Sequence, residues 1–230
     1  MYEQGLPVEH LGTPLGTFRS MSIHESQSRL WENNVGLSKE FWGYLFPRLK
    51  EKYSPVFEGV DFDDFYRAIN KVEAGFIRTE SDELTYPAHI FLRTEIERDL
   101  IDGTLSVDDL PQRWNQGMEQ YLGITPQSDK EGVLQDPHWF GGAFGYFPTY
   151  TLGTMMSTQQ FNAVNRDHPE FLSQMKEGNV SLLKGWLNRN IHQHGKRFGT
   201  KELIERATGK PPGSDDYIEY LETKYSALYK

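Results

Sequence analysis

Apolar residues recur at intervals of three and four along most of the chain, which is the spacing of amphipathic helices. The apolar positions of segment 61–76 are Phe62, Phe65, Ile69, Val72 and Phe76. Asp61 before them is a suitable N-cap. Similar spacing is found in segments 36–53, 82–102, 106–123, 155–165, 168–177 and 179–194. With Thr200 and Ser214 as the expected N-caps of two last helices, the pattern predicts a mainly α fold, one multi-helix domain over residues 1–230 without a linker.

Proline and glycine mark where these helices are expected to bend or end. Pro47 lies inside segment 36–53 and predicts a kink or a break, because proline removes a backbone hydrogen bond. Gly103 and Gly123 follow the last apolar positions of their segments and predict helix ends. Segment 126–154 differs, because glycine, proline and aromatic residues dominate it without a clear period. A loop of this length favours a functional role.

Composition narrows the classes of protein that the chain can belong to. Its 230 residues carry a formal net charge of -9, which does not suit the phosphate backbone of a nucleic acid. It has no Cys, which fits a reducing compartment. We find no apolar run long enough for a membrane span, and the first ten residues do not resemble a signal peptide. We therefore expect a cytoplasmic protein with no nucleic-acid or membrane partner.

A few residues could carry chemistry, and each has a plainer reading. Glu25 could ligate a metal, but a surface carboxylate in a helix is the commoner role, and a catalytic site needs about three protein ligands. Arg78 could bind a carboxylate with both arms of its guanidinium, or be a solvated or ion-paired cation. His138 could donate to a developing oxyanion or be a satisfied core histidine. His192 and His194 point to different helix faces, and we expect them to act as cations at a helix C-terminus.

Three segments resemble, in order, the motifs of one enzyme family, the thermostable (Taq) carboxypeptidases. Residues 24–27 match its HESQ-type motif, and residues 77–82 match IRxxAD, with Ser81 where alanine is usual. Residues 132–139 match GxxQDxHW fully. With three matches in order across most of the chain, the sequence resembles the C-terminal half of a member of this family, which is one of zinc metallopeptidases.

The resemblance implies roles for individual residues. Glu25 would be the third zinc ligand, beside two histidines and a general-base Glu that an HExxH helix supplies in this family. Arg78 would hold the C-terminal carboxylate of the peptide substrate, with Gln135 also in substrate binding. His138 and Tyr146 would stabilise the oxyanion or position the substrate. The family's fold is mostly helical with a long cleft, so this chain would form one side of it, and its members are usually homodimers.

The sequence departs from the family in one large respect, because it contains no HExxH. Tyr2-Glu3-Gln4-Gly5 resembles the end of a stretch that follows that motif in the family. We therefore expect a truncated half that keeps one zinc ligand, lacks the general base and is inactive alone. Its function would be that of a metallocarboxypeptidase; the alternatives are a non-catalytic binding module and one half of a split enzyme. Exposed apolar surface would make the chain self-associate or bind the missing N-terminal half.

Overall fold

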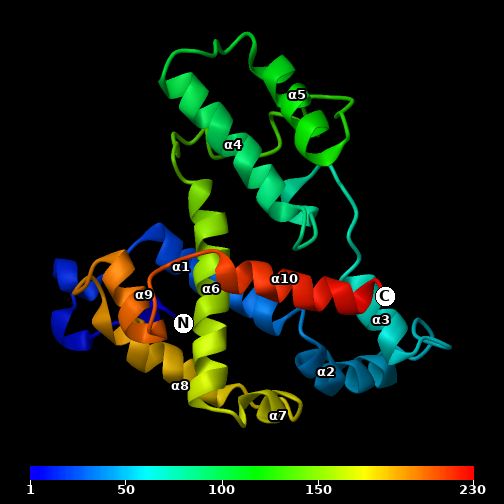
Figure 1. The fold of residues 1–230 in the computed structure, drawn as a ribbon, viewed down its shortest axis with the longest axis vertical. Helices are drawn as coiled ribbons and strands as arrows, with labels where there is room; N and C mark the ends of the chain where they lie inside the picture. Colours follow the sequence, from blue (N-terminus) through cyan, green and yellow to red (C-terminus); the bar gives the residue numbers. More distant parts are fainter. The chain divides into compact units, whose positions relative to one another are not determined.

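The computed structural model describes residues 1–230, and all of its regular elements are helices (Figure 1). No β-strand occurs among these residues, so the predicted mainly α fold class is confirmed. The chain divides into two compact units: residues 1–69 with 152–230 form unit 1, and residues 70–151 form unit 2. That all 230 residues act as one domain stays a prediction. None of the helices combines the length and apolar character that crossing a bilayer requires.

Unit 1 is a bundle of helices around one large apolar cluster. Its longer helices are α1 (Met21–Arg29), α2 (Lys39–Lys52), α3 (Phe62–Ile69), most of α6 (Pro148–Asp167), α8 (Ser181–Asn190), α9 (Thr200–Thr208) and α10 (Asp215–Leu228). Shorter helices are η1 (Glu3–Gly5), η2 (Val8–His10), η3 (Pro14–Gly16), η4 (Leu30–Val35), α7 (Phe171–Met175) and η6 (His192–His194). Of these, η4 is a π-helix that continues α1 directly.

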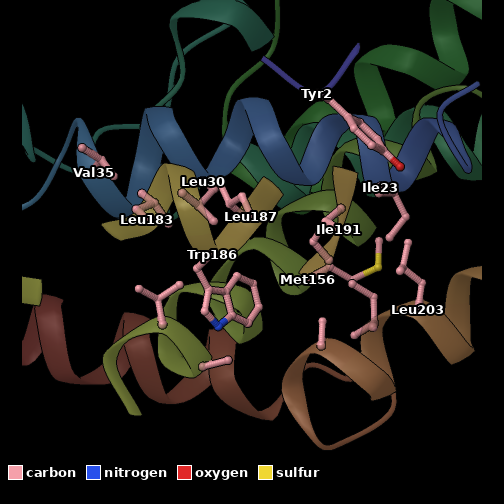
Figure 2. Close-up of a cluster of buried hydrophobic side chains, with 14 of the residues drawn as sticks. Tyr2, Ile23, Leu30, Val35, Met156, Leu183, Trp186, Leu187, Ile191 and Leu203 are labelled. Atoms are coloured by element: carbon pink, nitrogen blue, oxygen red, sulfur yellow. The ribbon is translucent and has the colours of Figure 1, made fainter. Parts of the chain in front are cut away.

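The cluster of unit 1 is formed where α1, α6, α8 and α9 meet (Figure 2). Figure 2 shows Ile23, Met156, Ile191 and Leu203 grouped together, and Leu30, Leu183 and Leu187 grouped beside the Trp186 indole. Full burial of an apolar side chain of this size contributes about 1.5–3 kcal/mol relative to exposure. The helical spacing in the sequence thus marks the residues that hold this unit together.

Unit 2 is smaller and contains η5 (Arg78–Glu80), α4 (Tyr86–Ile101), α5 (Leu110–Leu122) and the start of α6. Leu92 and Ile96 of α4 pack with Trp114 and Met118 of α5. Gly117 lets the two helices approach closely, because a Cβ there would collide with the Leu92 side chain. The loop 123–147 closes over this pair and contributes Val133 to the cluster.

Several helix boundaries differ from those expected. α2 runs through Pro47 without a break. Pro47 has no N–H group for the Gly43 carbonyl, but Gly43 is exposed, so water can bond that carbonyl instead. Asp61 caps its helix as expected, since its Oδ1 accepts from the Asp64 N–H group. That helix ends at Ile69 instead of residue 76. Gly103 and Gly123 end their helices in the left-handed region, as predicted.

Two more boundaries lie away from the places that the sequence suggested. The last residues of the expected loop 126–154 are helical, because α6 begins at Pro148, where proline is well placed in a first turn. Gly199 is the N-cap of α9 and Thr200 its first residue, whereas Ser214 is the N-cap of α10 as expected.

Candidate active site

Arg78 of η5 is buried against Asp136 of the loop that follows α5. Its Nε and Nη2 donate to the same oxygen, Asp136 Oδ1, at 3.0 and 2.7 Å. Its Nη1 donates to the Tyr86 hydroxyl at 2.7 Å. An arginine side chain has five N–H groups; these bonds use three of them, and two remain. Arg78 is 5% exposed. The motifs that carry Arg78 and Asp136 therefore form one site.

A second arginine reaches the same carboxylate from the other side. Arg93 Nε of α4 donates to Asp136 Oδ2 at 2.7 Å, and Nη1 donates to the His89 carbonyl at 2.8 Å. Arg93 is 0% exposed, and its guanidinium lies over the Trp114 ring with Cζ 4.5 Å from the ring centroid. The face of an indole attracts a cation, which offsets part of the cost of burying this charge.

Burial and charge together set the protonation states of this site. Burial acts to raise the pKa of Asp136, but the hydrogen bonds and charges of Arg78 and Arg93 outweigh it and hold that pKa below its usual value. Burial lowers the pKa of Arg93 to about 10, although Asp136 opposes the shift, so it stays cationic near neutral pH. Burial, then the charge of Arg93, lowers the pKa of His89 to about 4, so His89 is neutral.

Gln135 connects the loop to the chain just before Arg78. Its Oε1 accepts from the Arg78 backbone N–H group at 2.8 Å. Its Nε2 donates to the carbonyls of Phe76 at 2.9 Å, Glu131 at 2.8 Å and Gly132 at 3.2 Å. These bonds fix the position of Arg78 relative to Asp136. The role of Gln135 in substrate binding stays a prediction.

His138 lies among aromatic rings beside the two arginines. Its Nε2 is 3.1 Å from the Tyr150 hydroxyl, within hydrogen-bond distance, and its Nδ1 is 3.8 Å from Asp136 Oδ1. The ring packs on Phe147 with centroids 4.3 Å apart, and its centroid is 5.5 Å from that of Tyr146. The structure therefore places His138, Tyr146, Arg78 and Gln135 together in unit 2.

Some residues of this site were not singled out from the sequence. They are Tyr86, Arg93, Asp136 and Tyr150. One signal was present for Arg93, because it lies three residues from both Ile90 and Ile96 on the apolar face of α4. A charged residue on such a face is almost always paired. Asp136 could have been found too, since it lies inside the GxxQDxHW match.

Glu25 belongs to unit 1, on the second turn of α1. Ser20 is the N-cap of this helix, and its Oγ accepts from the Ile23 N–H group at 3.3 Å. Ser28 Oγ lies 2.8 Å from Glu25 Oε2 and holds the carboxylate against its own helix. On α6, Gly153 faces this turn so closely that an added Cβ would lie 2.8 Å from Glu25 Cβ. The backbone that carries Glu25 thus rests directly on α6.

Ser26 and Gln27, two other positions of the HESQ match, hold α1 in place. Gln27 Nε2 donates to Ser26 Oγ and to Gln160 Oε1 of α6, both at 3.0 Å, and Gln160 Nε2 donates to Ser26 Oγ at 2.9 Å. Gln27 Oε1 and His192 Nε2 are 2.8 Å apart. His192 was expected to be a cation at a helix end; instead it is 3% exposed, and burial lowers its pKa to about 4. It is therefore a neutral partner of Gln27.

The residues of this chain do not form a complete metal site. No three His, Asp or Glu side chains are arranged to hold an ion, whereas catalytic zinc takes about three protein ligands. Glu25 is partly exposed, and a carboxylate is a suitable donor for zinc, so the chain could supply one ligand. His24 beside it has Nε2 3.9 Å from Glu3 Oε1. A metal would need further ligands from outside the residues described.

Comparison with known proteins places this chain and its helical fold among the metallopeptidases. The family model described as Carboxypeptidase Taq (M32) metallopeptidase matches residues 1–225, so the chain belongs to this family. It is 45% identical to thermostable carboxypeptidase 1 of Thermus thermophilus, over 100% of this chain and 45% of that protein. It is 46% identical to carboxypeptidase 1 of Bacillus subtilis, over 100% of this chain and 46% of that protein.

Solved structures agree with the family assignment. A structure titled BsuCP Crystal Structure matches with a TM-score of 0.96 and 46% identity, over 100% of this chain and 46% of that chain. The M32 carboxypeptidase of Deinococcus radiodurans matches with a TM-score of 0.94 and 43% identity, over 99% and 46% of the two chains. The chain therefore spans about half the length of the curated relatives that it matches. The resemblance drawn from the three motifs is confirmed.

Proposed function

We propose that this chain forms part of a metallocarboxypeptidase that releases amino acids from the C-termini of peptides. Its family is one of metallopeptidases, and the relatives that match over its whole length are named carboxypeptidases. The observation that carries the proposal is the site around Arg78. An enzyme that removes only terminal residues must recognise a free carboxylate, and a guanidinium with N–H groups to spare is suited to that.

The proposal assigns Arg78 to the terminal carboxylate of the substrate, with Gln135 beside it. Gln135 holds the Arg78 backbone, so its contribution includes the orientation of that residue. His138 and Tyr146 are assigned to the developing oxyanion or to the position of the substrate. Tyr150 shares a hydrogen bond with His138 Nε2, which orients the imidazole before substrate binds. Such fixed donors lower the barrier because they need not reorganise during the reaction.

The metal-dependent part of the reaction needs residues that these 230 do not contain. We assign Glu25 as one ligand of a zinc ion, which would supply an activated water for attack on the peptide bond. The sequence has no HExxH, so the other ligands and the general base must come from elsewhere. We therefore propose that this chain alone is inactive, that it works in the cytoplasm, and that it pairs with an N-terminal half or with a second copy of itself.

A second candidate is a peptide-binding module without catalysis. The absence of HExxH from the sequence favours it, because Arg78 could still bind a carboxylate where no hydrolysis follows. The two candidates share the carboxylate contact and differ in whether the fold supports release of the terminal residue.

A chimera distinguishes them. Residues 1–225 would replace the matching segment of the Thermus thermophilus relative, and release of the last residue from N-acetyl-trialanine would be measured with zinc present. We expect release that Arg78→Met abolishes and that Arg67→Met, at an exposed arginine of α3, leaves unchanged. A folded, zinc-loaded chimera without release would leave the binding module as the function.

A further inference from the structure

Arg78, Arg93 and Asp136 form one cluster among the buried charged residues of unit 2, which also include Glu83 and Glu97. Arg78 and Arg93 are cations, and the carboxylate that both bind is the single anion Asp136. The three side chains together carry one net positive charge. Burying an unpaired charge costs free energy, so this positive charge needs another interaction to offset that cost.

The ion pairs of the two arginines both go to Asp136. His89 is neutral, because burial and the arginines lower its pKa to about 4. The carboxylate of Glu97 accepts from the Trp139 indole N–H group at 2.9 Å and makes no ion pair with either arginine. The rings of Trp114 and Phe147 lie against Arg93 at 4.5 and 5.4 Å from Cζ, and they stabilise its charge without neutralising it.

The two arginines bind different oxygens of Asp136 and differ in exposure. Asp136 Oδ1 is bonded by Arg78, and Oδ2 by Arg93. Arg93 is 0% exposed, so a ligand in solvent cannot touch it, whereas Arg78 keeps a small exposed area. If Asp136 were paired with Arg78 alone, its charge would repel an incoming carboxylate about as strongly as Arg78 attracts it. The positive charge of Arg93 offsets that of Asp136, so the net interaction of the site with a carboxylate becomes attractive.

We propose that Arg93 is a positioning residue that acts through Asp136: it takes up the second oxygen of that carboxylate and keeps the Arg78 site cationic, so that Arg78 can bind a peptide's terminal carboxylate. The inference rests on the function proposed above. It adds that the specificity for a free carboxylate depends on a residue that never contacts the substrate. Arg78 on its own would be an ion-paired structural arginine.

Arg93→Met in the 230-residue chain removes the charge of Arg93 and leaves Arg78 and Asp136 in place. The probes are N-acetyl-trialanine and its C-terminal amide, and binding is followed by NMR at the Trp139 indole N–H group. The expected result is a loss of affinity for the acid of at least about tenfold, with the amide unchanged, because one charge at short range acts on the carboxylate only. Removing one partner of a buried ion pair is usually destabilising, so the folding of Arg93→Met is checked first by circular dichroism.

Two further variants distinguish charge from structure. Arg93→Lys keeps the cation and should keep most of the preference for the acid. The double variant Arg93→Met with Asp136→Asn restores one net positive charge and should recover the preference relative to Arg93→Met alone. A general loss of packing would lower binding of acid and amide alike. If Arg93→Met does not fold, Arg93→Gln replaces it, because its amide can still donate to Asp136.

The outcomes separate this inference from the proposed function. A folded Arg93→Met protein that prefers the acid as strongly as wild type overturns the role of Arg93. Failure of the double variant to recover any preference over Arg93→Met also overturns it, since charge would then not be the cause. Wild type that binds acid and amide equally counts against the carboxylate contact of Arg78, and so against the proposed function itself.

Discussion

Gln27 and His192 meet across unit 1: Oε1 and Nε2 are 2.8 Å apart, although the residues are 165 positions apart in the sequence. Through this bond α1, which carries Glu25, is tied to η6. We expect His192→Leu to lower the free energy of unfolding by about 1–3 kcal/mol, because the buried carbonyl of Gln27 would lose its partner. His192→Gln can still donate and should cost less. Urea unfolding of the two variants measures the difference, and equal costs would show that the bond is not the cause.

The same histidine predicts a dependence of stability on pH. The pKa of His192 is lowered to about 4 in the folded chain, against 6.5 for an ordinary histidine. Between these values the unfolded chain binds a proton that the folded chain does not, so stability falls as pH drops from 6.5 toward 4. His89, with a pKa of about 4, acts in the same direction. Urea unfolding from pH 7.5 to 4.5 should show a smaller decline for His192→Gln than for wild type; parallel declines would contradict this.

Gly153 allows α6 to touch α1 at Glu25. Gly153→Ala places a Cβ 2.8 Å from Glu25 Cβ and 2.9 Å from the Glu25 carbonyl carbon, so the helices must separate. We expect a loss of about 1–3 kcal/mol in unfolding free energy. Gly43→Ala on α2 is the matched control, since no atom lies within 4 Å of its Cβ position. It should stabilise the chain by up to about 1 kcal/mol, as alanine does in a helix. A neutral Gly153→Ala would show that the contact is not tight.

Asp136 holds two buried arginines, so its removal should damage unit 2. We expect Asp136→Asn to destabilise this unit by about 3–5 kcal/mol, because it leaves buried cations without their carboxylate. Asp63→Asn is the matched control: Asp63 bonds Lys39 at 3.0 Å, but both side chains are mostly exposed, so the cost should be about 1 kcal/mol or less. Hydrogen exchange of α4 amides measures the local effect, and unchanged protection in Asp136→Asn would contradict the account.

Much of the fold could be predicted from helical spacing, because burial of one face is what selects a helix. The stripe of α3 shows the limit of that signal. Val72 and Phe76 continue the period beyond Ile69, yet the helix ends there. Phe76 packs instead with the cluster of α4 and α5 in unit 2, a contact that its spacing in the sequence does not encode. Tertiary packing therefore decided this boundary.

The candidate site was predictable residue by residue only through the family resemblance. Arg78, Gln135 and His138 lie inside matched motifs and Tyr146 lies beyond the last one; all four are in unit 2, although their individual roles stay predictions. Arg93 and Tyr150 lie outside the three matched motifs, and only the folded chain shows that they contact Asp136 and His138. The buried state of His192 was also hidden, because a histidine near a helix end looks the same in sequence whether it is exposed or enclosed.

The most direct measurement of the central claim is the ratio of dissociation constants for N-acetyl-trialanine and its C-terminal amide, for wild type and for Arg78→Met. The account predicts that wild type binds the acid more tightly and that Arg78→Met removes the preference, whereas the exposed control Arg67→Met keeps it. An Arg78→Met protein that remains folded and still prefers the acid would contradict the assignment of Arg78 to the terminal carboxylate.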